Sequence, residues 1–145
     1  FLALAGRIWL ARSQALTSPS MTTFPLTGTV LFAHGSRDPL WRAPIEAVQT
    51  YIQTHNPQVP VRCAYLELST PDLGQAVQEL IDIGTRAITI VPMFLGTGKH
   101  AREDLPVLLE ELRVRHPHVH FNTQAAIGED PRMTALMADI ACNAD

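Results

Sequence analysis

The 145-residue sequence is poor in cysteine and in aromatic residues, and it has no long run of basic charge. Its two cysteines, Cys63 and Cys142, form neither a C-x-x-C pair nor a clustered Cys/His finger, so neither a disulfide framework nor a cysteine metal site is expected. Aromatic residues make up 6% of the chain and the net charge is -3, which argues against a nucleic-acid partner. Two reduced thiols favour a cytoplasmic location.

Several well-known motifs are also missing. A P-loop needs a glycine five positions before Gly98 and a Ser or Thr after Lys99, but Met93 and His100 stand there. No G-x-S-x-G elbow surrounds Ser36, and the short apolar run at positions 1–5 could not span a bilayer. The sequence therefore supports neither a nucleoside triphosphatase nor a serine hydrolase, and it predicts no contact with a membrane.

Residues 1–20 differ from the remainder of the chain. They contain no acidic residue, carry Arg7 and Arg12, and precede Met21. This pattern is that of a transit peptide or of an extension outside the fold, and we expect the folded domain to comprise residues 21–145. With 46% hydrophobic residues, that length is enough for one α/β domain with its own core.

From Met21 onward, apolar runs of strand type alternate with helical patterns. This alternation predicts an α/β fold with a small parallel sheet of about four strands and helices on both faces. The exposed edges of so small a sheet favour a homodimer. Expected strands are Thr29–Ala33, Val59–Leu68, Arg86–Phe94 and Val119–Ala126; expected helices are Pro39–Thr54, Pro71–Ile83 with Thr70 as N-cap, His100–Arg115 and Pro131–Cys142.

His34, Glu67 and His100 are the main candidates for a functional site. Each lies 33 residues from the next and at or just beyond the end of an apolar run. Because this interval is about one strand-plus-helix unit, a parallel sheet would bring all three to its carboxyl edge. Two imidazoles and a carboxylate in one cleft can bind a divalent transition metal and accept protons. Taken singly, each also has a plainer interpretation as a turn cap, a solvated strand end or an ordinary helix start.

Four segments carry a resemblance to a known family: residues 31–37 (LFAHGSR), 64–68 (AYLEL), 71–73 (PDL) and 91–106 (VPMFLGTGKHAREDLP). Together they resemble the small sirohydrochlorin chelatases, class II chelatases of the cobaltochelatase and ferrochelatase kind. The resemblance covers about residues 29 to 130. It implies a class II chelatase fold, related to flavodoxin-like sheets, that inserts a divalent metal into the tetrapyrrole sirohydrochlorin in cobalamin or siroheme biosynthesis.

The resemblance also implies the roles of individual residues. It places His34, His100 and Glu67 at the metal and catalytic site, and it implies that a single-domain chain works as a homodimer. No tightly bound cofactor is expected, since cobalt, iron or nickel is itself a substrate.

The chemistry of metal insertion fits these residue types. Neutral imidazoles can replace water on the ion and accept the two pyrrole N–H protons, while Glu67 can complete the metal site, orient a histidine or carry protons away. The positive end of a helix beginning at His100 would favour its neutral ring. A polycarboxylate macrocycle also needs polar and cationic groups at its rim, and the candidates are Ser36, Arg37, Lys99 and Arg102. Each of the cations is otherwise a solvated surface residue.

Two other functions remain open from the sequence. A histidine phosphatase would also place His-Gly after a strand, but Ala33 stands where its chemistry needs an arginine. A metal or tetrapyrrole carrier would use the same ligands without turnover. His116, His118 and His120 form a second cluster, for which a strand-edge surface is favoured over weak metal binding.

Overall fold

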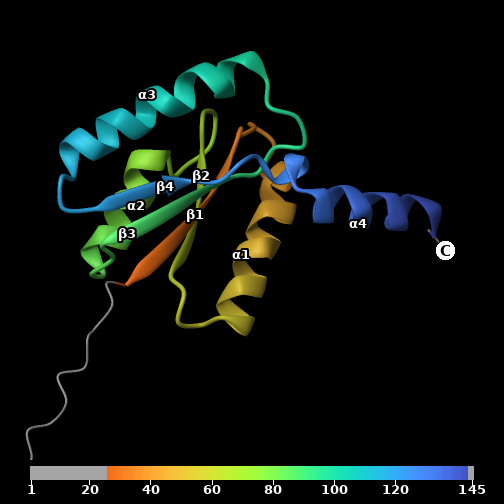
Figure 1. Cartoon of the computed structure of the whole chain (residues 1–145), viewed down its shortest axis with the longest axis horizontal. Coiled ribbons are helices and arrows are strands. Elements are labelled where there is room, and N and C mark those ends of the chain that lie inside the picture. Colours follow the sequence, from red (N-terminus) through yellow and green to blue (C-terminus); the bar gives the residue numbers. More distant parts are fainter. Residues whose placement is uncertain (1–25, 144–145) are drawn as a thin grey trace, which may run out of the picture.

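A computed structural model describes residues 26–143 of the chain, so the expectation for residues 1–20 lies outside the described residues. Strands and helices alternate along this part, as the sequence pattern predicts (Figure 1). In chain order the elements are β1 (Thr27–Ala33), η1 (Pro39–Arg42), α1 (Ala43–His55), β2 (Val61–Tyr65), α2 (Leu73–Asp82), β3 (Ala87–Pro92), α3 (Lys99–Arg115), β4 (His120–Thr123), η2 (Ile127–Glu129) and α4 (Pro131–Cys142).

The four strands form one parallel sheet in the order β2-β1-β3-β4. β1 lies between β2 and β3, with Ala33 opposite Tyr65 and Phe32 opposite Pro92. The loops that follow these three strands therefore meet at one carboxyl edge. The expected small parallel sheet is confirmed.

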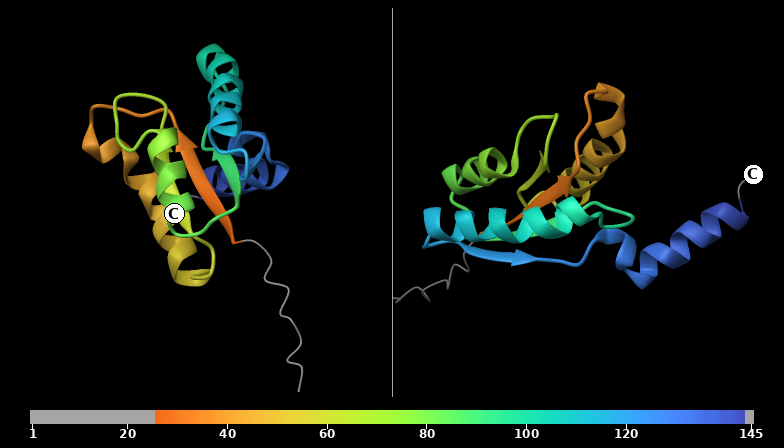
Figure 2. Two further views of the ribbon diagram at one scale, coloured as in Figure 1. Left: turned by 90° about the vertical axis from the view of Figure 1, so that its left-hand side faces the viewer. Right: turned by 90° about the horizontal axis from the view of Figure 1, so that it is seen from above.

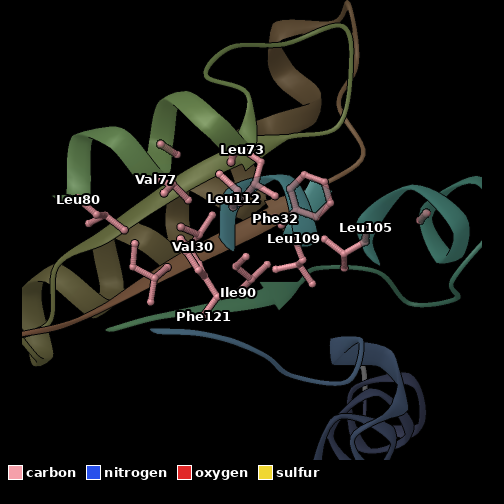
Figure 3. Close-up of a cluster of buried hydrophobic side chains, with 14 of the residues drawn as sticks. Val30, Phe32, Leu73, Val77, Leu80, Ile90, Leu105, Leu109, Leu112 and Phe121 are labelled. Atoms are coloured by element: carbon pink, nitrogen blue, oxygen red, sulfur yellow. The ribbon is translucent and has the colours of Figure 1, made fainter. Parts of the chain in front are cut away.

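One face of the sheet carries the larger core, which α2 and α3 cover (Figure 3). Alternate strand residues point to this face, because successive side chains of a strand lie on opposite sides. Phe32 and Phe94 pack edge to face, with their ring centroids 6.1 Å apart. The buried members of this core are Val30, Phe32, Ala64, Leu73, Ala76, Val77, Leu80, Ile88, Ile90, Phe94, Ala101, Leu105, Leu109, Leu112, Phe121 and Ala126.

The opposite face is covered by α1, whose Ile45 and Ile52 pack on a smaller buried cluster. This cluster contains Leu31, Ala33, Val61, Cys63, Tyr65 and Val91. Helices thus lie on both faces, as expected, and each face of the sheet is apolar where a helix covers it.

Several element boundaries differ from those expected. Asp72, not Thr70, is the N-cap of α2, because its carboxylate accepts a hydrogen bond from Gln75 N–H and the Gln75 side chain accepts one from Asp72 N–H. β2 ends at Tyr65 rather than Leu68, and β4 is confined to His120–Thr123.

α4 has the bounds expected from the sequence. None of its residues is buried against the part of the chain that the structure describes. It extends away from the sheet and the other helices (Figures 1 and 2). Its apolar residues Met133, Leu136, Met137 and Ile140 recur at the spacing of one helical face, and Leu136 and Ile140 are 52% and 60% exposed. Among the described helices, none is long and apolar enough to cross a membrane.

Candidate functional site

The loops after β1 and β2 are joined by backbone hydrogen bonds beyond the ends of the two strands. Leu66 N–H donates to the Ala33 carbonyl at 2.9 Å, and Glu67 N–H donates to the His34 carbonyl at 3.0 Å. This extended pairing brings two side chains together, since His34 Nε2 lies 2.9 Å from Glu67 Oε1. Both side chains are about half exposed, so the pair stands at the rim of the carboxyl edge and not in the core.

Gly35 permits this close approach of the two loops. Its φ of +102° lies in the left-handed region, and a Cβ at this position would stand 1.7 Å from the Glu67 carbonyl oxygen. No residue with a side chain fits there. The glycine after His34 is therefore a requirement of the His34–Glu67 geometry.

A second link holds the same two loops together. Ser36 N–H donates to the Ser69 hydroxyl at 3.2 Å, and that hydroxyl donates to the Ser36 carbonyl at 2.8 Å. The Ser36 hydroxyl in turn accepts from Asp38 N–H at 3.1 Å. Ser36 thus shapes the turn that carries His34, and its expected role in binding substrate stays a prediction.

His100 reaches the site from the third strand unit, as the second residue of α3. His34 and His100 line one cavity of about 370 Å³ at the carboxyl edge. The remaining residues of its wall are Met93, Phe94, Leu95, Gly96, Gly98, Lys99 and Ala101. The equal spacing in the sequence therefore corresponds to a shared location in the fold.

The three candidate ligands do not form an assembled metal cage. Among residues 26–143, no group of three His, Cys, Asp or Glu side chains is close enough to hold one ion. Glu67 contacts His34 and is absent from the wall shared by His34 and His100. The arrangement is a hydrogen-bonded pair with a second imidazole on the same cavity, which is more open than a structural metal site.

Comparison with family models shows what this arrangement belongs to. The model of the CbiX family matches residues 28–144, from the second residue of β1 to beyond the end of α4. The chain belongs to the CbiX family.

Curated relatives of this CbiX-family chain are named sirohydrochlorin chelatases. It is 32% identical over 84 residues to the sirohydrochlorin cobaltochelatase of Methanopyrus kandleri, a match that covers 58% of this chain and 59% of that protein. Priestia megaterium has two similar proteins, a sirohydrochlorin cobaltochelatase (28% identical, 69% of this chain, 33% of that protein) and a sirohydrochlorin ferrochelatase (31%, 58% and 32%). The matched part of the chain thus spans about 60% of the archaeal relative's length.

Solved structures share the fold. A CbiX protein of cobalamin biosynthesis from Marinobacter aquaeolei superposes with a TM-score of 0.68 at 29% identity, covering 81% of this chain and 96% of that one. SirB, a sirohydrochlorin chelatase from Bacillus subtilis crystallised with cobalt, gives a TM-score of 0.66 at 24% identity over 79% of this chain. Only 51% of the SirB chain is covered, so the fold unit of this CbiX-family chain is about half of that protein.

The predicted rim residues of the CbiX-family chain lie in different places. Lys99 lines the cavity of the two histidines and stands 3.9 Å from Glu103, one helical turn away. Arg102 lines a neighbouring cavity of about 400 Å³ between α3 and the end of β4. Arg37 is exposed in the turn after His34. These positions surround the site, and their contact with a substrate stays a prediction.

The second histidine cluster is less regular than the sequence indicates. Only His120 belongs to β4, so His116 and His118 lie outside the strand. His116 caps the end of α3, and its ring lies against Phe121. The His116 N–H donates to the Leu112 carbonyl of α3, and the Val119 N–H donates to the His116 carbonyl, so residues 116–119 form a turn before the strand begins.

Two residues of the site are not predicted by the sequence pattern. Ser69 fixes the turn of His34, and Leu95, 66% exposed, forms an apolar part of the cavity wall. A serine two positions after Glu67 and 33 after Ser36 repeats the spacing of His34 and Glu67, and this repetition is the signal that could have revealed Ser69.

Proposed function

We propose that this CbiX-family chain is a sirohydrochlorin chelatase, which inserts a divalent metal, cobalt or else iron, into sirohydrochlorin in cobalamin or siroheme biosynthesis. The observation that carries the proposal is the direct contact of His34 with Glu67 beside a cavity that His100 shares. The names of the curated relatives supply the tetrapyrrole and the two metals.

The contact with Glu67 assigns the proton of the neutral His34 ring. An ionised carboxylate only accepts hydrogen bonds, so in this contact Nε2 carries the hydrogen and donates it to Oε1. Nδ1 then has the free lone pair, which can accept a proton or bind an ion. Glu67 therefore orients the imidazole and stabilises the positive charge that the ring gains when it takes a proton from the macrocycle.

The same pair has the dimensions of a metal-binding edge. Two ligand atoms in adjacent positions of an octahedral ion, each about 2.1 Å from it, are about 3.0 Å apart. The 2.9 Å between Nε2 and Oε1 is close to this value. Nε2 and Oε1 could bind an incoming ion with little movement of either side chain once the Nε2 proton has moved through solvent to Nδ1. When the ion passes to the ring, Nε2 is free again to accept a proton. His100, which shares the cavity with His34, is a further donor.

Metal insertion then needs two proton acceptors, because the ring loses two N–H protons as the metal enters. We assign one proton acceptor as His34, whose added positive charge is stabilised by Glu67. The other proton acceptor is His100. Lys99, Arg37 and Arg102 provide positive charge for the carboxylates of the macrocycle. Both proton acceptors lie at the rim of the site, where solvent can remove the protons.

The proposal is tested by anaerobic incubation of the chain with sirohydrochlorin and Co²⁺, Fe²⁺ or Ni²⁺, followed by absorbance of the metallated ring. We expect insertion above the spontaneous rate with catalytic amounts of protein. Stoichiometric binding without acceleration would instead identify a carrier. Glu67→Gln keeps the shape of the side chain but removes its charge, and it should lower the rate of metal insertion. An unchanged rate would show that Glu67 is only a solvated residue at the end of a strand.

We further propose a homodimer in the cytoplasm. A tetrapyrrole needs more cover than a cavity of about 370 Å³ provides, since ligand sites usually enclose most of their ligand. A second subunit would supply the missing wall. The two cysteines, both unpaired, support this location.

A further inference from the structure

Leu68, next to Glu67, has a strained backbone. Among residues 26–143 it is the only residue other than glycine with a positive φ, which is +60°. Leucine rarely occupies this left-handed region, because its Cβ crowds a neighbouring carbonyl oxygen, and glycine or asparagine usually stands there. Strain of this kind beside a site points to a function that retains it.

Hydrogen bonds on both sides hold Leu68 in this conformation. On one side, Glu67 N–H donates to the His34 carbonyl at 3.0 Å. On the other side, the Ser69 hydroxyl donates to the Ser36 carbonyl at 2.8 Å. Leu68 could leave the left-handed region only if one of these bonds broke. The loop that carries Glu67 therefore also fixes the direction of the Leu68 Cα–Cβ bond.

Burial does not explain why a leucine stands at this position. Leu68 is 54% exposed and belongs to neither buried cluster of the described residues. Leu66, two positions earlier, packs instead against the larger core. A single exposed leucine is ordinary on a protein surface. One that is both exposed and strained adds little to the stability of the fold.

Leu95 is a second exposed leucine at the same edge of the sheet. It is 66% exposed and lines the cavity that His34 and His100 share. A Cβ at Gly128 would lie 2.0 Å from the Leu95 carbonyl oxygen, so η2 packs directly against this loop. Leu95 therefore presents an apolar side chain to the site from a loop that η2 holds in place.

The strand order places the two leucines on either side of His34. β1 lies between β2 and β3. Leu68 follows β2, His34 follows β1 and Leu95 follows β3. Neighbouring strands are about 4.8 Å apart, so β2 and β3 are about 10 Å apart. A flat macrocycle can cover that distance and contact both leucines, whereas a metal ion or a small anion cannot.

We propose that Leu68 and Leu95 contact the flat apolar face of the macrocycle, one on each side of His34, and position its ring nitrogens over the imidazole. The identity of the ring rests on the proposed function. Apolar contact removes water from the ring face, and burial of one leucine side chain raises affinity at least about 10-fold. The left-handed backbone of Leu68 serves to direct its side chain toward the ring.

The test measures the binding of metal-free sirohydrochlorin under anaerobic conditions from the absorbance of the ring, with metal insertion assayed in parallel. Leu68→Asn and Leu95→Asn should each raise the dissociation constant of the ring at least about 10-fold, and they should raise KM more than they lower kcat. Leu68→Met keeps an apolar side chain and should restore most of the affinity. The matched control is Ile83→Asn, which changes a 51% exposed apolar residue between α2 and β3, at the opposite edge of the sheet, and should bind the ring like the wild type.

Stability separates a positioning role of Leu68 from a structural one. Asparagine tolerates the left-handed region better than leucine does, so Leu68→Asn should unfold at no lower urea concentration than the wild type while it binds the ring more weakly. A lower urea midpoint in Leu68→Asn would identify Leu68 as a packing residue and overturn its assignment.

Three further outcomes would overturn the inference. An unchanged dissociation constant with normal metal insertion would show that the leucines do not position the ring, and the proposed function would stand. No binding of the metal-free ring by the wild type would exclude the ring as their ligand. A lower molecular mass in light scattering, with unchanged affinity for the ring, would mean that the leucines contact a second copy of the chain. Binding that depends on both leucines without insertion of metal would instead contradict the proposed function and support the inference.

Discussion

Glycines in this chain have two different roles, which a substitution can separate. Gly35→Ala would place a Cβ against the Glu67 carbonyl in a left-handed conformation, and we expect a loss of more than about 2 kcal/mol in the free energy of unfolding. Gly96→Ala meets no atom within 4 Å and should change stability by less than about 0.5 kcal/mol. Urea unfolding of both variants checks this. Equal stability would show that the two loops do not approach as described.

The two site histidines should be needed for chemistry and not for folding. If each histidine is a proton acceptor and a metal ligand, as proposed, His34→Ala and His100→Ala should each slow metal insertion at least roughly 100-fold. Circular dichroism should remain unchanged, since both side chains are exposed. Near-normal insertion in either variant would contradict the assignment.

The two cysteines should differ in reactivity because burial acts on one of them. Burial, with a smaller contribution from the nearby Glu46 carboxylate, raises the pKa of the Cys63 thiol to about 11, so about one thiol in a thousand is ionised at pH 8. Cys142 is exposed at the end of α4. A thiol-disulfide reagent at pH 8 should therefore titrate one thiol in the native chain and two in denaturant. Rapid reaction of both native thiols would show that Cys63 is accessible.

At the scale of elements, the true start of α2 can be tested directly. Asp72→Ala removes the side chain that caps Gln75 N–H, and it should lower stability by about 1 kcal/mol, or the melting temperature by about 3 °C. Thr70→Ala, at the cap position expected from the sequence, makes the matched control and should have little effect. A larger loss of stability in Thr70→Ala than in Asp72→Ala would show that α2 begins after Thr70, as the sequence pattern predicts.

The start of a helix can be predicted where the sequence has both a capping residue and a residue that favours the first turn. α4 begins at Pro131 after the capping Asp130, and Pro at the first helical position is a strong local signal. Hydrogen bonding from Arg132 lowers the pKa of Asp130 to about 2, so this cap stays ionised down to strongly acidic conditions and is lost only as the pH falls through about 2. α2 was misplaced because Thr70-Pro71 imitates the same signal two residues too early.

Strand ends were less predictable, because an apolar residue does not show whether it has a partner strand. Leu66 to Leu68 continue the apolar pattern of β2, yet β1 ends at Ala33 opposite Tyr65 and the regular ladder stops there. The two later hydrogen bonds of Leu66 and Glu67 belong to the site. The spacing of 33 residues predicts that His34, Glu67 and His100 follow successive strands at the carboxyl edge. The contact between His34 and Glu67 depends in addition on side-chain rotamers and on the close approach at Gly35, which spacing does not determine.

At the scale of the whole molecule, the proposed dimer makes metal insertion depend on protein concentration. If a second subunit supplies one wall of the site, the rate per chain should fall on dilution below the dimer dissociation constant. Insertion assays across a hundredfold dilution series, with light scattering at the same concentrations, check this. A rate per chain that stays constant while the dimer dissociates would show that one subunit suffices.

The joined loops at the carboxyl edge also determine where the chain can be lengthened by protein engineering. His34, Ser36, Glu67 and Ser69 bond in register across two turns, so one added residue in either turn would shift every bond that follows it. The turn at residues 56–58, at the opposite edge of the sheet, is exposed, and its backbone bonds, from Asn56 N–H to Ile52 and from Val59 N–H to Asn56, stay within four residues along the chain. A guest peptide or a circular permutation site belongs there, where the new sequence would leave the site's geometry unchanged.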